Sequence, residues 1–301
     1  MTVAIVGASG FLGVQLINRL LHTSEHDIVA IARLPHDYHV AEKYQLRLTV
    51  KTATIMDESE MFDALLGVDV AFYFVHLMGQ TSDFYAQEAI AAERFSSACR
   101  TADVKRVIYM GGLGSDHENL SEHLLSRHNT GTILRDSLPL VLEFRASMII
   151  GNGSLAYDVI RNLVHKLPIM TLPRWSNSRT QPIALDDALN YLVAGISVRL
   201  KHNEIVEIGG SDVVTYKELY RRYAAWSGRY PFIIRLPFLP EWLGGWWLNL
   251  FMPRNHAKIG RIMVRSLSNS MVVTHPEITK RLFPEIHTAS IETALNATRQ
   301  A

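Results

Sequence analysis

The chain has 301 residues, enough for one large domain or two ordinary ones, and its 48% hydrophobic and 20% charged residues predict a packed core and exclude a disordered chain. The formal net charge of +1 gives no reason to expect a nucleic-acid partner. One cysteine, Cys99, excludes an internal disulfide framework and favours a reducing, cytoplasmic compartment. The first residues, MTVAIVGASG, lack a basic stretch and a cleavage site, so we interpret them as a strand and not as a signal peptide.

Short β-branched runs alternate with helical patterns in the first half, which predicts a parallel sheet covered by helices on both faces. The predicted strands are residues 2–7, 27–33, 47–55, 69–75, 106–112 and 139–151, and the clearest helices between them are 11–21 and 83–100. A helix at 156–166, a loop at 167–183, a helix at 184–196 and a strand at 204–210 follow. We therefore predict a dinucleotide-binding domain at 1–150, to which 180–210 returns, and a smaller lobe formed by 151–179 and 211–301.

The turn after the first predicted strand, GASGFLG, places glycines between a strand and a helix. Gly7 permits a tight turn, Gly10 lets the backbone approach a pyrophosphate, and Gly13 allows the helix to pack closely on the strand. Backbone N–H groups and the positive end of the helix would bind the phosphates. The position of this GxxGxxG motif predicts a dinucleotide site. Its candidate residues are Gly7, Ser9, Gly10, Phe11, Leu12 and Gly13.

Two polar residues after the second and third predicted strands are candidates for the adenosine end of the cofactor. Arg33 stands where an acid normally binds the ribose hydroxyls, and a guanidinium suits a 2′-phosphate. The sequence therefore favours NADP(H), with NAD(H) as the alternative cofactor and a solvated surface arginine as the alternative role. Asp57 is a candidate contact to the adenine amino group or, equally, a helix N-cap.

The fourth and fifth predicted strands end at the edge of the sheet where nicotinamide and its ribose would lie. Phe74, Val75 and His76 end the fourth strand, and Gly111 belongs to the MGGLG segment that ends the fifth. All are candidate cofactor contacts. For His76 a purely structural role is the alternative.

The segment LPFLPEWLGGWWLNLFMP, residues 236–253, resembles a membrane segment in composition. Prolines bracket its apolar run, Glu241 interrupts it, and 242–252 is shorter than the ~20 residues that a span requires. We predict a buried or partner-facing helix, with contact to a membrane surface or an apolar substrate as the alternative. Aromatic residues of the rear lobe would form either core or a pocket for a flat apolar ligand. They are Trp175, Trp226, Phe238, Trp242, Trp246, Trp247 and Phe251.

Several segments resemble the extended and atypical short-chain dehydrogenase/reductases, and the similarity covers essentially the whole chain. They are GASGFLG (7–13), VKRVIYMGGLG (104–114), LEFRASMIIGNGS (142–154), RTQPIALDDALNYLV (179–193) and EIGGSDVVTYKEL (207–219). The rear segment resembles bacterial NAD(P)-binding proteins of the NmrA-like branch. The resemblance implies an α/β Rossmann-type fold, that is, a doubly wound parallel sheet with a smaller, mostly helical C-terminal substrate lobe. It also implies a nicotinamide cofactor.

Catalysis in this family normally needs a Tyr-x-x-x-Lys pair on the helix after the fifth strand, where the tyrosine transfers a proton and the lysine lowers its pKa and holds the ribose. None of the eleven tyrosines has a lysine four residues later. At the expected place stand His123 and Arg127, which share one helix face. Arg127 is a candidate for the ribose contact and His123 for the proton donor, although a neighbouring cation favours neutral imidazole. The alternative is a helix that contacts the cofactor without transferring a proton.

Two functions remain open from the sequence. The first is an NADP(H)-dependent oxidoreductase of atypical type that acts on a small apolar carbonyl or quinone-like substrate, for which the cofactor carries the hydride. The second is a non-catalytic NADP(H)-binding sensor or scaffold with a regulatory protein partner. The histidines show no His-Glu-x-x-His spacing, and no Cys-x-x-Cys occurs, so we predict no metal site.

Overall fold

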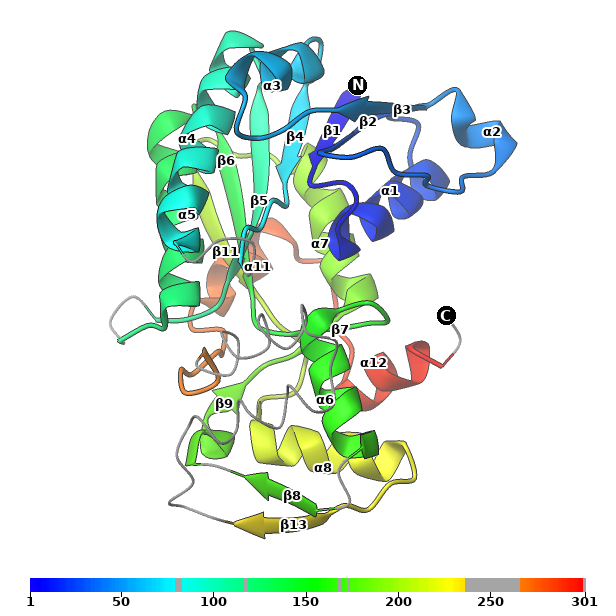
Figure 1. Cartoon of the computed structure of the whole chain (residues 1–301), viewed down its shortest axis with the longest axis vertical. Coiled ribbons are helices and arrows are strands. Elements are labelled where there is room, and N and C mark those ends of the chain that lie inside the picture. Colours follow the sequence, from blue (N-terminus) through cyan, green and yellow to red (C-terminus); the bar gives the residue numbers. More distant parts are fainter. Residues whose placement is uncertain (79–82, 116–118, 167–168, 173, 236–265, 300–301) are drawn as a thin grey trace.

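A seven-stranded, all-parallel sheet forms the centre of the molecule (Figure 1). The computed structural model describes residues 1–78, 83–115, 119–166, 169–172, 174–235 and 266–299. The strands of the sheet are β1 (Thr2–Val6), β2 (Asp27–Ala32), β3 (Leu48–Thr52), β4 (Val70–Tyr73), β5 (Arg106–Gly112), β6 (Val141–Ala146) and β11 (Glu204–Ile208). Their order across the sheet is β11-β6-β5-β4-β1-β2-β3. From β1 the chain adds β2 and β3 on one side and then β4, β5 and β6 on the other. The strand order therefore reverses between β1 and β4, which is where a doubly wound sheet opens a ligand crevice.

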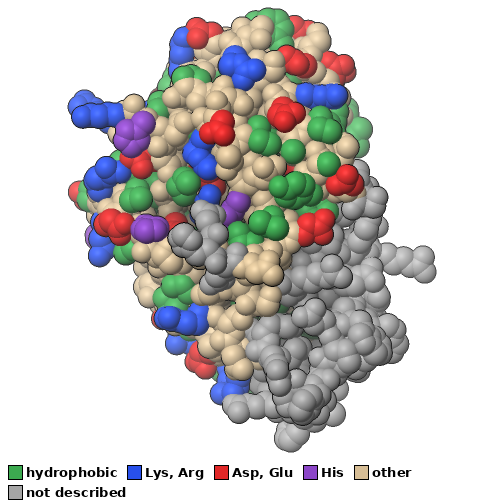
Figure 2. Space-filling view, turned by 90° about the vertical axis from the view of Figure 1, so that its left-hand side faces the viewer, with side chains coloured by type: hydrophobic (Ala, Val, Ile, Leu, Met, Phe, Trp, Pro, Cys, Tyr) green, Lys and Arg blue, Asp and Glu red, His purple; other side chains and the backbone are tan. Residues whose placement is uncertain are grey.

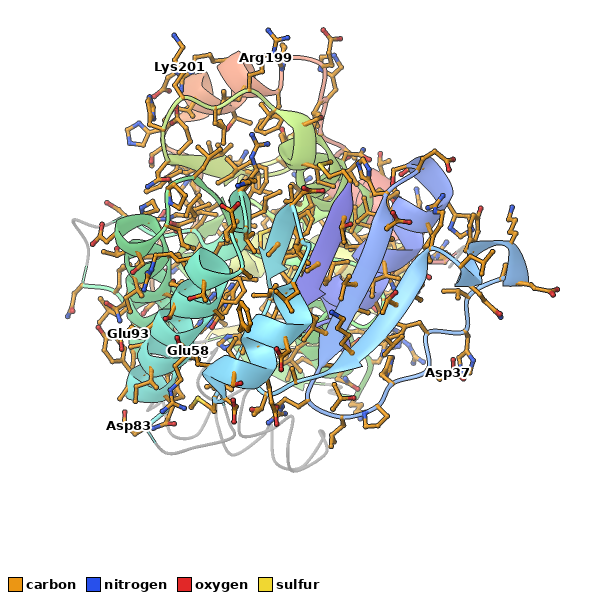
Figure 3. The ribbon with its side chains drawn as sticks, turned by 90° about the horizontal axis from the view of Figure 1, so that it is seen from above. Asp37, Glu58, Asp83, Glu93, Arg199 and Lys201 are labelled. Atoms are coloured by element: carbon orange, nitrogen blue, oxygen red, sulfur yellow. The ribbon has the colours of Figure 1, made fainter. Side chains whose placement is uncertain are left out.

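Helices cover both faces of the sheet, as Figure 3 shows from above. On one face lie α1 (Phe11–Thr23), α7 (Leu185–Ser197) and α11 (Pro276–Leu282), with a core around Leu16, Leu192 and Phe283. On the other face lie α3 (Glu58–Leu65), α4 (Phe84–Thr101) and α5 (Glu122–Ser137), with a core around Met61, Phe95 and Leu134. The short α2 (Glu42–Gln45) precedes β3. Because both faces are buried, the inner strands β1, β2, β4 and β5 are nearly continuous apolar runs, whereas the edge strand β3 is partly exposed. The predicted Rossmann-type α/β fold is confirmed.

A smaller lobe lies beyond the carboxyl ends of the strands (Figure 1). In the described residues its helices are α6 (Leu155–Lys166), α8 (Tyr216–Trp226) and α12 (Ile291–Ala297), which enclose a third core around Tyr157, Tyr220 and Leu295. Short strand pairs tie its segments together. They are β7 (Ile149–Ile150) with β10 (Ile183–Ala184), β9 (Arg179–Thr180) with β12 (Val214–Thr215), and β8 (Ile169–Leu172) with β13 (Phe232–Arg235).

Two predictions from the sequence are wrong in this region. The apolar run 139–151 forms two strands and not one, because the chain leaves the main sheet at Ser147, whose hydroxyl donates to the carbonyl of Gln181 at 2.6 Å. Residues 149–150 then pair with β10. The predicted loop 167–183 contains β8, the 3₁₀ turn η1 (Arg174–Asn177), β9 and β10. The predicted helix in 236–253 lies outside the described residues, as do the aromatic residues within it.

A buried carboxylate lies on β6, the strand next to the edge strand β11. Glu143 on β6 is fully buried and forms ion pairs with Arg135 of α5 and with Arg145, whose Nε is 2.7 Å from Oε1. Gly131 of α5 makes room for it, since a Cβ there would lie 2.3 Å from the carboxylate. The pairing is required because an unpaired buried charge is strongly destabilising.

Among the described residues, no helix is long and apolar enough to cross a membrane. Figure 2 shows the face that carries α4 and α5, where acidic and basic side chains are interspersed over the coloured surface.

Candidate functional site

The glycine turn after β1 has the geometry that the sequence predicts. Gly7 adopts a φ of +87°, and a Cβ on it would lie 2.9 Å from the backbone of Phe74. A Cβ on Gly13 would lie 2.6 Å from the carbonyl oxygen of Ala8. Both glycines are therefore needed for backbone reasons. Gly10 is the N-cap of α1 and no side chain caps this helix end, so the helix presents its N-terminal turn to a ligand.

A cleft opens beside this turn at the carboxyl ends of β1, β2 and β4. It is lined by residues of these strand ends and of the loops that follow them, including seven of the predicted cofactor contacts. These are Gly7, Ser9, Gly10, Arg33, Phe74, Val75 and His76. Phe11 and Leu12 are not among the lining residues; they are partly buried in the first turn of α1, and the ring of Phe11 packs against Gly153.

Asp57 and Gly111 lie outside this cleft lining. The Asp57 carboxylate accepts hydrogen bonds from the backbone N–H groups of Ser59 and Glu60 at 2.9 and 3.0 Å and so caps α3. This matches the N-cap alternative. Gly111 faces the buried Glu143, whose Oε1 would lie 3.1 Å from an added Cβ.

His76, in the loop after β4, is held by a carboxylate from α4. Its Nδ1 lies 2.5 Å from Oε1 of Glu88, which also accepts a hydrogen bond from the Leu77 N–H at 2.9 Å. The other carboxylate oxygen accepts from the hydroxyl of Ser126 on α5. Glu88 is 3% exposed, whereas the His76 side chain is 31% exposed. A buried acid therefore fixes the ring orientation of a histidine that faces the cleft.

His123, in the first turn of α5, contacts the other side of His76. The Nε2 atoms of the two rings are 3.3 Å apart, and the rings are nearly parallel with centroids 5.4 Å apart. Nδ1 of His123 lies 3.2 Å from the hydroxyl of Ser266. The Ser266 hydroxyl is in turn 2.7 Å from that of Ser121, the N-cap of α5. A continuous series of polar contacts thus runs from Glu88 to Ser121.

Burial and charge shift the pKa values along this series. Burial alone would raise the pKa of Glu88, but the hydrogen bond and charge of His76, the charge of Arg127 and the Ser126 hydroxyl outweigh it and lower the pKa to about 2. Burial, then the charges of His76 and Arg127, lower the pKa of His123 to about 3. Glu88 is therefore ionised and His123 neutral near pH 7, the latter as expected beside a fixed cation.

Arg127 is held against β5. Its guanidinium donates to the carbonyl of Met110 and lies over the Tyr109 ring, 5.0 Å from the centroid. It is not among the residues that line the cleft. On the same helix, Nε2 of His128 lies 3.0 Å from the carbonyl of Gly112.

A second cavity lies between the end of β5, α5 and the smaller lobe. Its lining is mainly apolar and comes from segments far apart in the sequence. It includes Gly112, Leu124, Met148, Ile160, Tyr220 and Met271. His123 and Ser266 are its polar members that belong to the series described above. Because His76 lines the cleft and His123 lines the cavity, their contact joins the two sites.

Sequence reasoning missed Glu88 and Ser266. Glu88 falls on the apolar stripe of α4 with Phe84, Ala91 and Phe95, and an acid at such a position was a usable signal. Ser266 is separated from His123 by 143 residues, and nothing local marks it.

Among the described residues, no group of three or more His, Cys, Asp or Glu side chains is arranged to hold a metal ion.

Comparison with known proteins identifies the family. The profile of the NAD(P)H-binding family matches residues 7–161, just over half of the chain. This range contains the glycine turn, His76 and His123. The chain belongs to the NAD(P)H-binding family. The predicted atypical short-chain dehydrogenase/reductase fold and the predicted nicotinamide cofactor are confirmed, whereas the NmrA-like branch and the preference for NADP(H) stay predictions.

Several characterised proteins are similar to this NAD(P)H-binding protein. A ceramide reductase of Caulobacter vibrioides is 27% identical over 243 residues, which are 78% of this chain and 73% of that protein. The structure of a triphenylmethane reductase of Citrobacter sp., complexed with NADP(H), is similar with a TM-score of 0.74 at 15% identity, covering 99% of this chain and 100% of that one. A UDP-glucuronic acid 4-epimerase of Bacillus cereus, in complex with UDP-glucuronic acid and NAD, gives a TM-score of 0.74 at 13% identity, covering 100% and 98%.

Proposed function

We propose that this protein is an NADP(H)-dependent oxidoreductase that reduces an apolar carbonyl or quinone-like substrate. The observation that carries the proposal is the contact between His76 and His123, which joins the cofactor cleft to an apolar cavity. A substrate in this cavity would lie beside the nicotinamide end of the cleft. The mainly apolar lining favours a hydrophobic acceptor over a sugar nucleotide. Two reductases among the similar proteins support this choice.

The residues of the cleft fit a dinucleotide. The backbone at Gly7 and Gly13 leaves no room for a Cβ, and the uncapped start of α1 supplies N–H groups to phosphates. Bound there, the reduced cofactor would supply a hydride. The protein itself would orient the acceptor in the cavity and exclude water, and His123 would face the acceptor oxygen with its Nδ1.

Oxidation of NADPH in the presence of different acceptors tests the proposal. The panel contains long-chain ketones, aromatic ketones and quinones, with a sugar nucleotide as the polar control, and the loss of NADPH absorbance is followed. We expect turnover with an apolar acceptor and none with the control. Tight NADPH binding without turnover on any acceptor would contradict the proposal.

Cofactor preference is tested separately by titrating NADPH and NADH. Arg33 is exposed at the cleft, and we expect its guanidinium to contact the 2′-phosphate. Arg33→Ala should weaken NADPH binding about 10- to 100-fold, since a hydrogen bond to a charged group contributes about 1.5–3 kcal/mol, and should leave NADH affinity nearly unchanged. Asp37→Ala, a nearby exposed residue, is the control. Equal affinities of the unaltered protein for both cofactors would exclude the preference.

The second candidate function is a redox sensor or scaffold of the NmrA-like kind. It is favoured by the position of Arg127, which is bonded to Met110 and so does not occupy the place of the family lysine in the cleft. In that case NADPH and NADP⁺ would bind with different effects on a regulatory partner, and no acceptor would be reduced.

A further inference from the structure

We propose that Glu88, His76 and His123 form a proton relay that carries a proton from the cofactor cleft to the apolar cavity. The proposal rests on the reductase function proposed above, because the relay needs an acceptor that gains a proton. It assigns His76 as the proton carrier, His123 as the donor to the acceptor and Glu88 as a positioning residue. None of these is the tyrosine or lysine of the family motif.

The geometry sets the direction of each hydrogen bond. The Glu88 carboxylate can only accept, so Nδ1–H of His76 donates to it at 2.5 Å. This leaves Nε2 of His76 to face Nε2 of His123 at 3.3 Å. If a hydrogen bond forms between these two nitrogens, one of them carries the proton and the other accepts it. The bond therefore couples the protonation state of His76 to the tautomer of His123.

Two states follow from this coupling. When His76 is an imidazolium, its Nε2–H donates to His123, and the proton of neutral His123 must be on Nδ1. This atom lies beside the Ser266 hydroxyl, and both residues line the cavity. When His76 is neutral, His123 carries its proton on Nε2 and donates it to His76. Nδ1 of His123 then accepts from the Ser266 hydroxyl.

Donation of one proton to the acceptor converts the first state into the second. The N–H bond at Nδ1 of His123 breaks, and an O–H bond forms on the acceptor oxygen, whose carbon has received the hydride. In the same step the N–H bond at Nε2 of His76 breaks and one forms at Nε2 of His123. Both rings end neutral, and the acceptor has gained a hydride and a proton. Solvent returns a proton to His76, whose side chain is 31% exposed.

The charges around the relay favour a proton on His76 and not on His123. Glu88 contacts His76 directly, whereas His123 is partly buried beside the cations of His76 and Arg127, and its pKa is lowered to about 3. Tyr73 and Tyr109 face the relay from the neighbouring strands. Burial raises the pKa values of both, so neither hydroxyl ionises near neutral pH. His123 therefore stays neutral and changes only the nitrogen that carries its proton.

Nitrogen-15 NMR of the histidine side chains in the whole protein, without substrate, tests the relay directly. As the pH is lowered, we expect His76 to become doubly protonated and, in the same transition, the His123 proton to move from Nε2 to Nδ1. This measurement needs no variant and no turnover. A His123 tautomer that stays constant while His76 titrates would overturn the proposal, as would protonation of His123 before His76.

Glu88→Gln removes the carboxylate charge at nearly constant shape. We expect the coupled transition to move to lower pH, because the carboxylate in contact with Nδ1 of His76 favours the protonated ring. Glu93→Gln is the matched control: this exposed residue lies on the same helix and is labelled in Figure 3. If Glu88→Gln does not fold, Ser126→Ala, which removes one donor to Glu88, should shift the transition upward by a smaller amount. An unshifted transition in the folded variant would contradict the role of Glu88.

Kinetics separate the relay from the reductase function. With a reducible acceptor, Glu88→Gln should lower kcat about 10- to 100-fold with little change in KM or NADPH affinity, since a positioned acid contributes about 10²–10⁴-fold. An unchanged kcat would overturn the relay while leaving the reductase proposal intact. The coupled transition without reduction of any acceptor would instead overturn the reductase proposal.

Discussion

The cofactor cleft and the apolar cavity are built in opposite ways. All described residues of the cleft lining come from the first 77 residues. They lie at the carboxyl ends of β1 and β2, in the turns after the first four strands, and at Met61 of α3. The described lining of the cavity extends from Gly112 to Met271 and combines the sheet, α5, α6 and α8. The cleft is therefore a property of local sequence. The cavity exists only when distant segments have packed together, and His76 and His123 lie where the two meet.

The largest effect should follow from a change at the base of the cleft. Gly13→Ala places a Cβ 2.6 Å from a backbone oxygen that cannot move away easily. We expect a loss of about 1–3 kcal/mol in the free energy of unfolding in urea, together with strongly weakened NADPH binding. In Gly10→Ala the added Cβ is 3.2 Å from the nearest atom, so stability should change less while NADPH affinity still falls. Equal loss of stability in both variants would show that the turn geometry is misjudged.

The junction between the two sites should make stability depend on pH. The pKa of His123 is about 3 in the folded protein against 6.5 in the unfolded chain, so the free energy of unfolding falls as the pH drops from 6.5 toward 3. The pKa of Glu88 is about 2 in the folded protein against 4.5 in the unfolded chain. Its contribution to the free energy of unfolding is therefore present above pH 4.5 and is lost as the pH falls toward 2. Each group adds a slope of up to about 1.4 kcal/mol per pH unit. Urea unfolding at a series of pH values should show His123→Gln flattening the upper range and Glu88→Gln the lower one. Unaltered slopes would contradict these pKa shifts.

A change inside the cavity should leave the cleft unaffected. Ala156 lines the cavity from α6, and Ala156→Leu adds apolar volume there. We expect about a tenfold rise in KM for an apolar acceptor, since overpacking costs about 1–3 kcal/mol, with no change in NADPH affinity measured by titration. A parallel loss of NADPH affinity would show that the two sites are not independent.

The smallest effect should come from the edge of the cleft. Asp57→Ala removes the cap of α3 and should lower the free energy of unfolding by about 1 kcal/mol. Because the carboxylate is already bonded to Ser59 and Glu60, NADPH affinity should not change. A tenfold weaker NADPH affinity in Asp57→Ala would instead show that Asp57 contacts the cofactor. Asp57→Asn, which can still cap, is the matched control.

This contrast explains what the sequence could predict. The strand at 106–112, the glycine turn and the cleft residues around His76 depend on neighbours in the chain, and the structure has them in place. The strand break at 147 and the strands within 167–183 depend on partners such as β12 and β13, which no local pattern reveals. His123 could be placed on its helix by analogy with the family motif. Its partners His76 and Ser266, 47 and 143 residues away, could not be inferred.

The buried Glu143 also bears on how the chain assembles as it is synthesised. β6 pairs with β11, which is made about sixty residues later, so until then β6 is the edge of a growing sheet. An apolar edge strand readily pairs with a strand of another molecule, and inward-pointing charges oppose such pairing. Glu143 and Arg145 provide such charges on β6. We therefore expect the charges that are paired in the finished sheet to oppose association of the nascent chain through this edge.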